Sequence, residues 1–128
     1  MPGDIMYGEI DLESYTISII RINSALSKLE SDEDISEIKE LFDDSFNDLD
    51  KLYKDIVDDL NQEEVNLNEY YLFFQNGRQT FPQYIEVLGN IDNSELEDCL
   101  GNLVNVFRNL NKIAEGFNQD AMIEWIMI

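Results

Sequence analysis

Hydrophobic residues recur at helical spacing over most of this chain. The first series runs from Leu12 to Leu29 in steps of three and four residues, and Asp11 stands just before it in the position of an N-cap. The β-branched residues between Thr16 and Ile22 also suit a strand. We therefore expect a helix here, with a strand as the alternative.

The second series, from Ile35 to Leu60, is the clearest. Its apolar residues fall on one face of a helix. Asp34 with Glu37 three residues later is typical of a capping box, and Asn61 is suited to end the helix in the left-handed conformation. A helix of this length extends about 39 Å.

The middle of the chain supports two interpretations. A helical series that begins at Leu67 is predicted to end at Asn76-Gly77, and a short helix is predicted to follow over residues 80–89. An Asn-Gly pair between two aromatic runs is also typical of a β-hairpin, here near residues 70–81. We favour the two helices because the neighbouring segments are helical.

Two further helices are predicted toward the end of the chain. Ser94 and Glu97 match a capping box at the start of a long helix that Gly116 ends. Residues 120–128 are predicted to form a last helix. The sequence thus predicts an all-α protein, a compact bundle of five or six helices. We see no linker or repeat, so residues 1–128 are expected to form a single acidic helical domain.

The chain is strongly acidic. It has 128 residues with 28 Asp and Glu against 8 Lys and Arg, which gives a formal net charge of -20. Residues 30–64 hold fifteen acidic and three basic residues, a net charge of -12. This balance excludes binding to nucleic-acid phosphates, which requires clustered Lys and Arg. The hydrophobic fraction of 44% argues for a folded domain rather than a disordered tail.

The acidic residues of this segment fall on the side of the predicted helix away from its apolar residues. Several lie four residues apart, so like charges are neighbours. A charged helix face commonly serves solubility alone. The single sign and the concentration of this charge favour instead a surface that binds a cationic partner. The predicted partner-binding residues are Glu33, Glu37, Glu40, Asp44, Asp48, Asp55, Asp58 and Asp59.

The sequence offers little for catalysis. It has no His, and its single cysteine, Cys99, falls in an apolar stripe. We predict a buried structural thiol, no enzymatic activity, and neither a metal nor another cofactor. The acidic pairs Glu37/Glu40 and Glu95/Asp98 support an alternative, a metal-dependent hydrolase of phosphorylated substrates.

Aromatic residues gather in the middle of the chain. We expect them to be mainly core, with one or two exposed as anchors of an interface. The C-terminal residues 125–128 are apolar, and they either close the core or contact another chain, which leaves a homo-oligomer open. The aromatic residues in question are Tyr70, Tyr71, Phe73, Phe74, Phe81 and Tyr84.

These observations predict a small acidic binding protein that neutralises a basic protein by electrostatic and steric blocking. Two types fit this description: an immunity protein or antitoxin, and a nucleic-acid mimic of the anti-restriction or anti-CRISPR kind. Besides the hydrolase, a structural adaptor bundle is the other alternative. The first ten residues lack the basic and apolar regions of a signal peptide, and no segment has the length of a membrane span. We therefore expect a cytoplasmic protein that contacts neither membrane nor nucleic acid.

Overall fold

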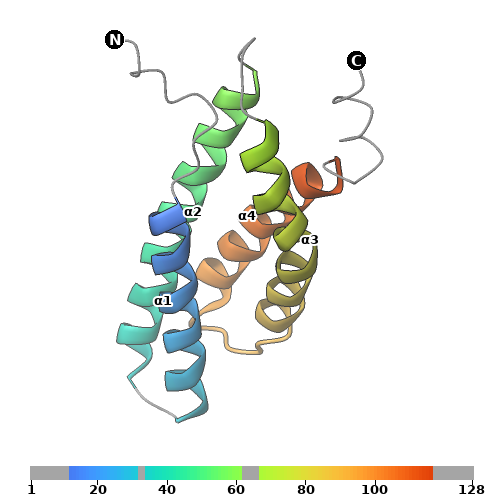
Figure 1. Ribbon diagram of the computed structural model, residues 1–128. Helices are drawn as coiled ribbons and strands as arrows, with labels where there is room; N and C mark the ends of the chain where they lie inside the picture. The colour runs from blue at the N-terminus through green and yellow to red at the C-terminus, as the bar shows by residue number, and fades with distance from the viewer. Residues whose placement is uncertain (1–11, 32–33, 62–66, 117–128) are drawn as a thin grey trace, which may run out of the picture.

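The computed structural model describes residues 12–31, 34–61 and 67–116, which form four α-helices and no strand. Successive helices run in alternating directions (Figure 1). The prediction of an all-α protein is confirmed, whereas the predicted count of five or six helices is wrong for these residues. The helices are α1 (Leu12–Glu30), α2 (Ile35–Leu60), α3 (Leu67–Gly89) and α4 (Glu97–Gly116).

The helices pack as two pairs. α1 lies along α2, α3 lies along α4, and α2 also contacts α4. Aromatic rings pack between the two pairs and also between α3 and α4. Tyr15 of α1 meets Phe73 of α3 edge to face, with ring centroids 5.0 Å apart, and Tyr84 of α3 stacks on Phe107 of α4 at 5.3 Å. This aromatic layer is the centre of the core.

α1 is a helix, so the strand alternative for residues 16–22 is wrong. Ile22 is fully buried, while Leu12 at the start of the helix is half exposed. Asp11, the predicted N-cap, lies outside the described residues, as does the predicted helix over residues 120–128. No described helix is long and apolar enough to cross a membrane.

α2 has the bounds that the sequence predicts. The Asp34 carboxylate accepts a hydrogen bond from the backbone N–H of Ser36 at 3.0 Å and so caps the N-terminus. The prediction of a left-handed Asn61 is wrong. The backbone of Asn61 is right-handed, with φ -85° and ψ -5°. Its N–H donates to the carbonyl oxygens of Val57 and Asp58, both at 3.2 Å. The last turn therefore closes without a left-handed residue.

α3 is one continuous helix that begins at Leu67 and ends at Gly89, so the favoured helical prediction is confirmed, whereas the predicted break at Asn76-Gly77 and the hairpin alternative are wrong. Asn76 and Gly77 lie inside it, and the ring of Phe81 occupies the space beside Gly77 that a side chain would need. An ideal Cβ at residue 77 would come within 2.3 Å of Phe81 Cε2. Pro82 lies within the helix at an exposed position. Pro82 has no N–H, so it donates no hydrogen bond to the carbonyl of Arg78, four residues earlier. Arg78 is exposed, so water reaches this residue.

α4 begins at Glu97. The prediction that Ser94 caps this helix is wrong. Instead Asn93 closes the preceding turn: its side-chain oxygen accepts from the N–H of Glu95 at 2.9 Å, and its carbonyl accepts from the N–H of Leu96 at 3.1 Å. An Asn side chain competes well for such a local hydrogen bond. The turn over residues 94–96 displaces the start of the helix to residue 97.

Candidate partner-binding surface

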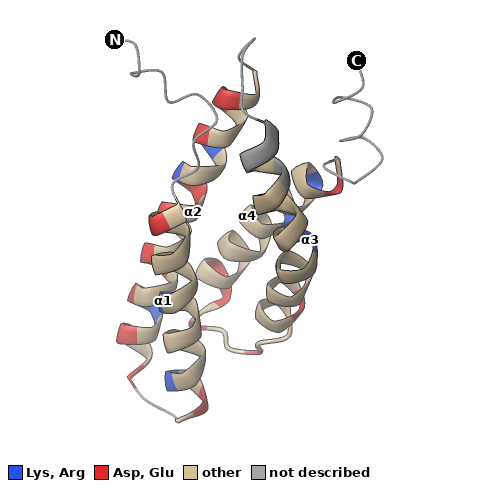
Figure 2. Cartoon of the chain, viewed as in Figure 1, with Lys and Arg blue, Asp and Glu red and all other residues tan. Residues whose placement is uncertain are grey.

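Acidic residues follow the outer edge of α2, on the side away from α4 (Figure 2). The helix carries nine acidic and three basic residues. Its opposite face holds the buried side chains, so helical periodicity directs the acids outward as predicted. Glu33 lies outside the described residues. We call the remaining seven predicted residues the acidic edge: Glu37, Glu40, Asp44, Asp48, Asp55, Asp58 and Asp59.

Two members of the acidic edge bind basic residues of α1. Arg21 Nη1 lies 2.5 Å from Asp48 Oδ2, and Lys28 Nζ lies 3.3 Å from Glu37 Oε1. These are the only basic residues of α1. Each pair is partly exposed and contributes at most about 1 kcal/mol to stability. Both pairs hold α1 against α2, so Glu37 and Asp48 have an intramolecular role.

Asp59 is engaged by α3. The hydroxyl of Tyr70, whose side chain is fully buried, donates to Asp59 Oδ2 at 2.7 Å. A buried phenol needs such a partner, because leaving its hydroxyl without one would cost about 1–3 kcal/mol. Asp59 therefore satisfies a core residue rather than standing free on the surface.

Glu40, Asp44 and Asp55 remain fully available. All three are exposed, and none forms an ion pair within the described part of the chain. Asp58 is exposed as well. Glu40 and Asp44 lie one turn apart, so they repel each other at neutral pH. A cation brought by another molecule would relieve this repulsion.

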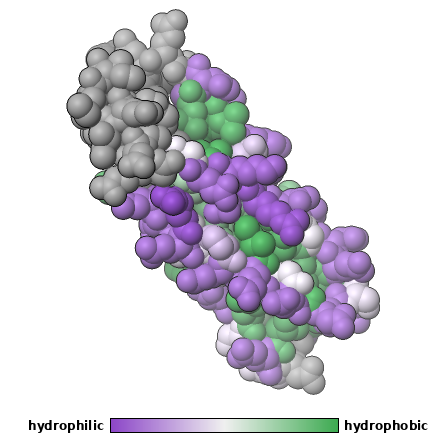
Figure 3. Space-filling model, turned by 90° about the vertical axis from the view of Figure 1, so that its right-hand side faces the viewer, coloured by the Kyte–Doolittle hydropathy of each residue, from purple (hydrophilic) through white to green (hydrophobic). Residues whose placement is uncertain are grey.

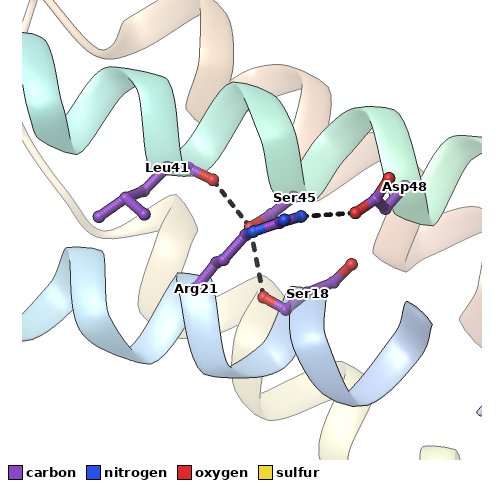
Figure 4. Close-up of polar contacts among 5 residues, drawn as sticks. All are labelled: Ser18, Arg21, Leu41, Ser45 and Asp48. Carbon is purple, nitrogen blue, oxygen red and sulfur yellow. Dashed lines mark hydrogen bonds and ion pairs between the residues drawn. The ribbon is translucent and has the colours of Figure 1, made fainter. Parts of the chain in front are cut away.

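Beneath the Arg21–Asp48 pair, α1 and α2 meet through small side chains (Figure 4). Ser45 Oγ lies 2.8 Å from Leu41 O and 3.2 Å from Ser18 O, so its single hydroxyl proton serves either carbonyl. Ser18 and Ser45 are both fully buried, and Ser18 Oγ has no hydrogen-bond partner among the described residues. The small serines let the two backbones approach closely and fix the acidic edge beside α1.

The outer face of α1 carries no charge between Glu13 and Glu30. Two isoleucines lie on it, Ile17 at 38% and Ile20 at 60% exposure. Sequence reasoning missed this face, although both residues fall outside the apolar stripe from Leu12 to Leu29 and so had no place in the core. The exposed residues of this uncharged face are Thr16, Ile17, Ile20, Asn23 and Ser27.

A small hollow of about 70 Å³ lies between α1 and α2. It is lined by Ser14 of α1 and by Asp48, Lys51, Leu52 and Asp55 of α2. A liquid water molecule occupies about 30 Å³, so the hollow has room for about two waters or for one small cationic head group. Two carboxylates against one ammonium give its lining a net charge of -1.

A wider hollow of about 350 Å³ lies where α3 is followed by α4. Its lining includes Leu88, Ile91 and Leu100 together with the carboxylates of Asp92 and Glu97, and it contains no basic residue. The side of the molecule that carries α3 is largely hydrophilic, with separate hydrophobic patches (Figure 3). Nothing in this hollow would neutralise an anionic ligand.

Cys99 is a buried thiol, as predicted. Its side chain is 2% exposed, and Sγ lies 3.2 Å from the carbonyl oxygen of Leu96, to which it donates. Burial raises the pKa of the Cys99 thiol above its ordinary value of 9.0. A thiol held in the protonated form is a poor nucleophile.

The aromatic residues of α3 are mainly core, as predicted. Tyr70, Phe73, Phe74 and Phe81 are buried and Tyr84 is half-buried. The side chain of Tyr71 and the C-terminal residues 125–128 lie outside the described part of the structure. Among the described residues, the large exposed hydrophobic side chains are therefore aliphatic, and the isoleucines of α1 are the ones beside the acidic edge.

Carboxylates of the described residues do not converge as a metal site would require. The described residues contain no group of three or more His, Cys, Asp or Glu side chains placed to hold a metal ion. Comparison with known proteins finds no matching family model, no matching curated protein and no matching solved structure. The acidic edge and the uncharged face of α1 next to it are the distinctive surface features of the described residues.

Proposed function

We propose that this protein binds a basic protein and blocks its cationic surface. An immunity protein or antitoxin acts on its toxin in this way, and a nucleic-acid mimic acts so on a nucleic-acid-binding enzyme. The observation that supports the proposal is the set of exposed carboxylates of Glu40, Asp44 and Asp55 on α2, none of which forms an ion pair with another described residue. A cationic partner would supply the counter-charges that the other described residues do not.

The net charge of -20 has a direct consequence for binding kinetics. A strongly acidic protein attracts a basic partner over a distance of about 10 Å at moderate salt and so speeds their encounter. The same charge repels nucleic acids and anionic membranes. Exposed ion pairs contribute little to residence time, so apolar contacts must hold the complex once it has formed.

Affinity capture from the source cells, followed by kinetics on the purified partner, tests this proposal. The captured protein should be basic, and its association rate should fall as salt is raised. The triple variant Glu40→Lys, Asp44→Lys and Asp55→Lys should associate more slowly than the parent protein. We expect at least a tenfold slower association, since steering by charge accelerates encounter by about 10–1000-fold.

A second triple variant controls for net charge alone. Glu86→Lys, Asp92→Lys and Glu95→Lys make the same change in charge at exposed positions in or near the connection from α3 to α4. This control should slow association far less, because its charges lie away from the acidic edge. Equal effects of the two variants, or an association rate independent of salt, would overturn the proposal.

A further inference from the structure

We infer that the acidic edge of α2 and the uncharged face of α1 form one docking surface, and that its occupant is an amphipathic cationic helix of the partner. This inference rests on the proposed function and adds the shape and chemistry of the segment that binds. The surface consists of Ile17 and Ile20 on α1 and of Asp44, Asp48 and Asp55 on α2. Its two halves are apolar and acidic, so one ligand has to present both apolar and basic side chains.

The two halves are adjacent. Ile17 lies three residues after Ser14 and four before Arg21, so it is a neighbour of both on the surface of α1. Ser14 lines the hollow that Asp48 and Asp55 also line. Arg21 is paired with Asp48 itself. The exposed isoleucine and the carboxylates of α2 therefore belong to one continuous surface.

The uncharged face of α1 is exceptional for this chain, in which 28% of residues are charged. A solvent-facing helix side normally carries charged residues, and isolated surface hydrophobic residues need no explanation. Here Ile17 and Ile20 lie one turn apart on a face with no charge to interrupt them. Such a pair buries together under a single turn of another helix.

Charge complementarity selects the occupant. Because the acidic edge flanks the isoleucines, a second copy of this chain would bring acidic residues of both copies close together. A cationic segment instead places Lys or Arg opposite Asp44 and Asp55. A basic head group also fits the hollow of about 70 Å³ between α1 and α2. An amphipathic helix presents an apolar stripe with a basic flank beside it. These two stripes match the row of isoleucines on α1 and the row of carboxylates on α2.

A synthetic helical peptide serves as the probe. It carries Leu at positions that share one face and Lys along one flank of that face, and its binding to the full chain is followed by fluorescence anisotropy. Two further peptides replace every Leu by Ser or every Lys by Glu. We expect the parent peptide to bind, the Ser peptide to bind at least tenfold more weakly, and the Glu peptide not to bind.

Paired variants of the protein locate the peptide. Ile17→Ser with Ile20→Ser should weaken binding of the parent peptide by about tenfold, which corresponds to losing about 1.4 kcal/mol of apolar contact. Leu72→Ser with Val87→Ser is the matched control, because these residues of α3 are 66% and 46% exposed. The control should change binding less than twofold. Thermal unfolding of both variants checks that each remains folded.

Three results would overturn the inference, and they separate it from the proposed function. If the captured basic protein binds the Ile17/Ile20 variant as tightly as the parent, charge alone drives binding, and only the proposed function stands. If sedimentation shows a dimer that the same variant loses, a second copy covers α1. If neither the peptides nor any basic protein bind, the inference and the proposed function both fail.

Discussion

The ring of Phe81 occupies the place that a side chain at residue 77 would need, so Gly77 and Phe81 are packed as a pair. A Cβ at residue 77 would lie 2.3 Å from Phe81 Cε2. The ring has little freedom to move, because Phe81 is fully buried among Tyr15, Phe73 and Phe107. Gly77→Ala should therefore lower the free energy of unfolding by about 1–3 kcal/mol through overpacking. Urea unfolding measures this change.

Gly101 provides the matched control within α4. A Cβ there meets nothing within 4 Å, so Gly101→Ala should gain the ordinary helix preference of alanine, about 0.5–1 kcal/mol. The two Gly→Ala substitutions are thus expected to have opposite signs. Stabilisation by both would show that Phe81 does not press on residue 77.

The ion pair between Arg21 and Asp48 contributes modestly to stability. A double-mutant cycle with Arg21→Ala and Asp48→Ala should give a coupling energy of about 0.5–1 kcal/mol, since both side chains are about one-third exposed. The coupling should shrink when salt is added. A coupling near zero at low salt would mean that the pair does not hold α1 on α2.

Salt should stabilise the folded protein at neutral pH. Nine acidic and three basic residues share α2, and unfolding lets them move apart. Added salt screens this repulsion over distances beyond about 10 Å. The thermal midpoint should therefore rise between low and moderate concentrations of sodium chloride. The triple Lys variant of Glu40, Asp44 and Asp55 should show a smaller rise, whereas a midpoint that falls with salt would contradict a repulsive surface.

Stability should fall as pH rises above about 9. Burial raises the pKa of the Cys99 thiol above 9.0 and the pKa of the Tyr15 phenol above 10.0, so both keep their protons longer when folded. The pKa of Lys54 is also raised, by its hydrogen bond to Asp50. The folded state then binds more protons than the unfolded state, and by linkage the free energy of unfolding decreases with pH.

Each group's contribution to the free energy of unfolding is fully present below the pKa of that group in the unfolded state. The contribution is lost as pH rises through the pKa of the group in the folded state. Tyr15→Phe keeps the ring contacts with Phe73 but removes the titrating phenol. Chemical denaturation at several pH values between 8 and about 11 should show a shallower decline for this variant. A decline as steep as that of the parent protein would exclude Tyr15 as a cause.

Local patterns in the sequence were sufficient to predict α2. Its apolar stripe and the Asp34 cap depend on neighbours within a few residues, and the helix begins and ends where they indicate. The continuity of α3 was not predictable in this way, because Gly77 is placed inside the helix, where the Phe81 ring occupies the position of a Cβ. That ring is held by Tyr15 and Phe107 from other helices, and no local pattern reports such contacts.

For the acidic edge too, the sequence predicted what depends on local spacing but not what depends on contacts between helices. Periodicity placed Glu40 and Asp44 on the solvent side of α2. Periodicity did not distinguish these two residues from Asp48 and Asp59, which bind side chains of α1 and α3. The uncharged face of α1 was not predictable, because neither a charge nor a motif marks its residues in the sequence.

The unequal burial of the helices implies an order in which they open. α1 contributes three buried residues, Ser18, Ile22 and Ala25, whereas α4 contributes eight. α1 therefore exposes the least apolar surface when it detaches, and its amides should exchange with deuterium before those of α4. A partner that binds across α1 and α2 has to find α1 in place. Its arrival should slow deuterium uptake in α1 most of all, and part of its affinity is spent on keeping that helix closed.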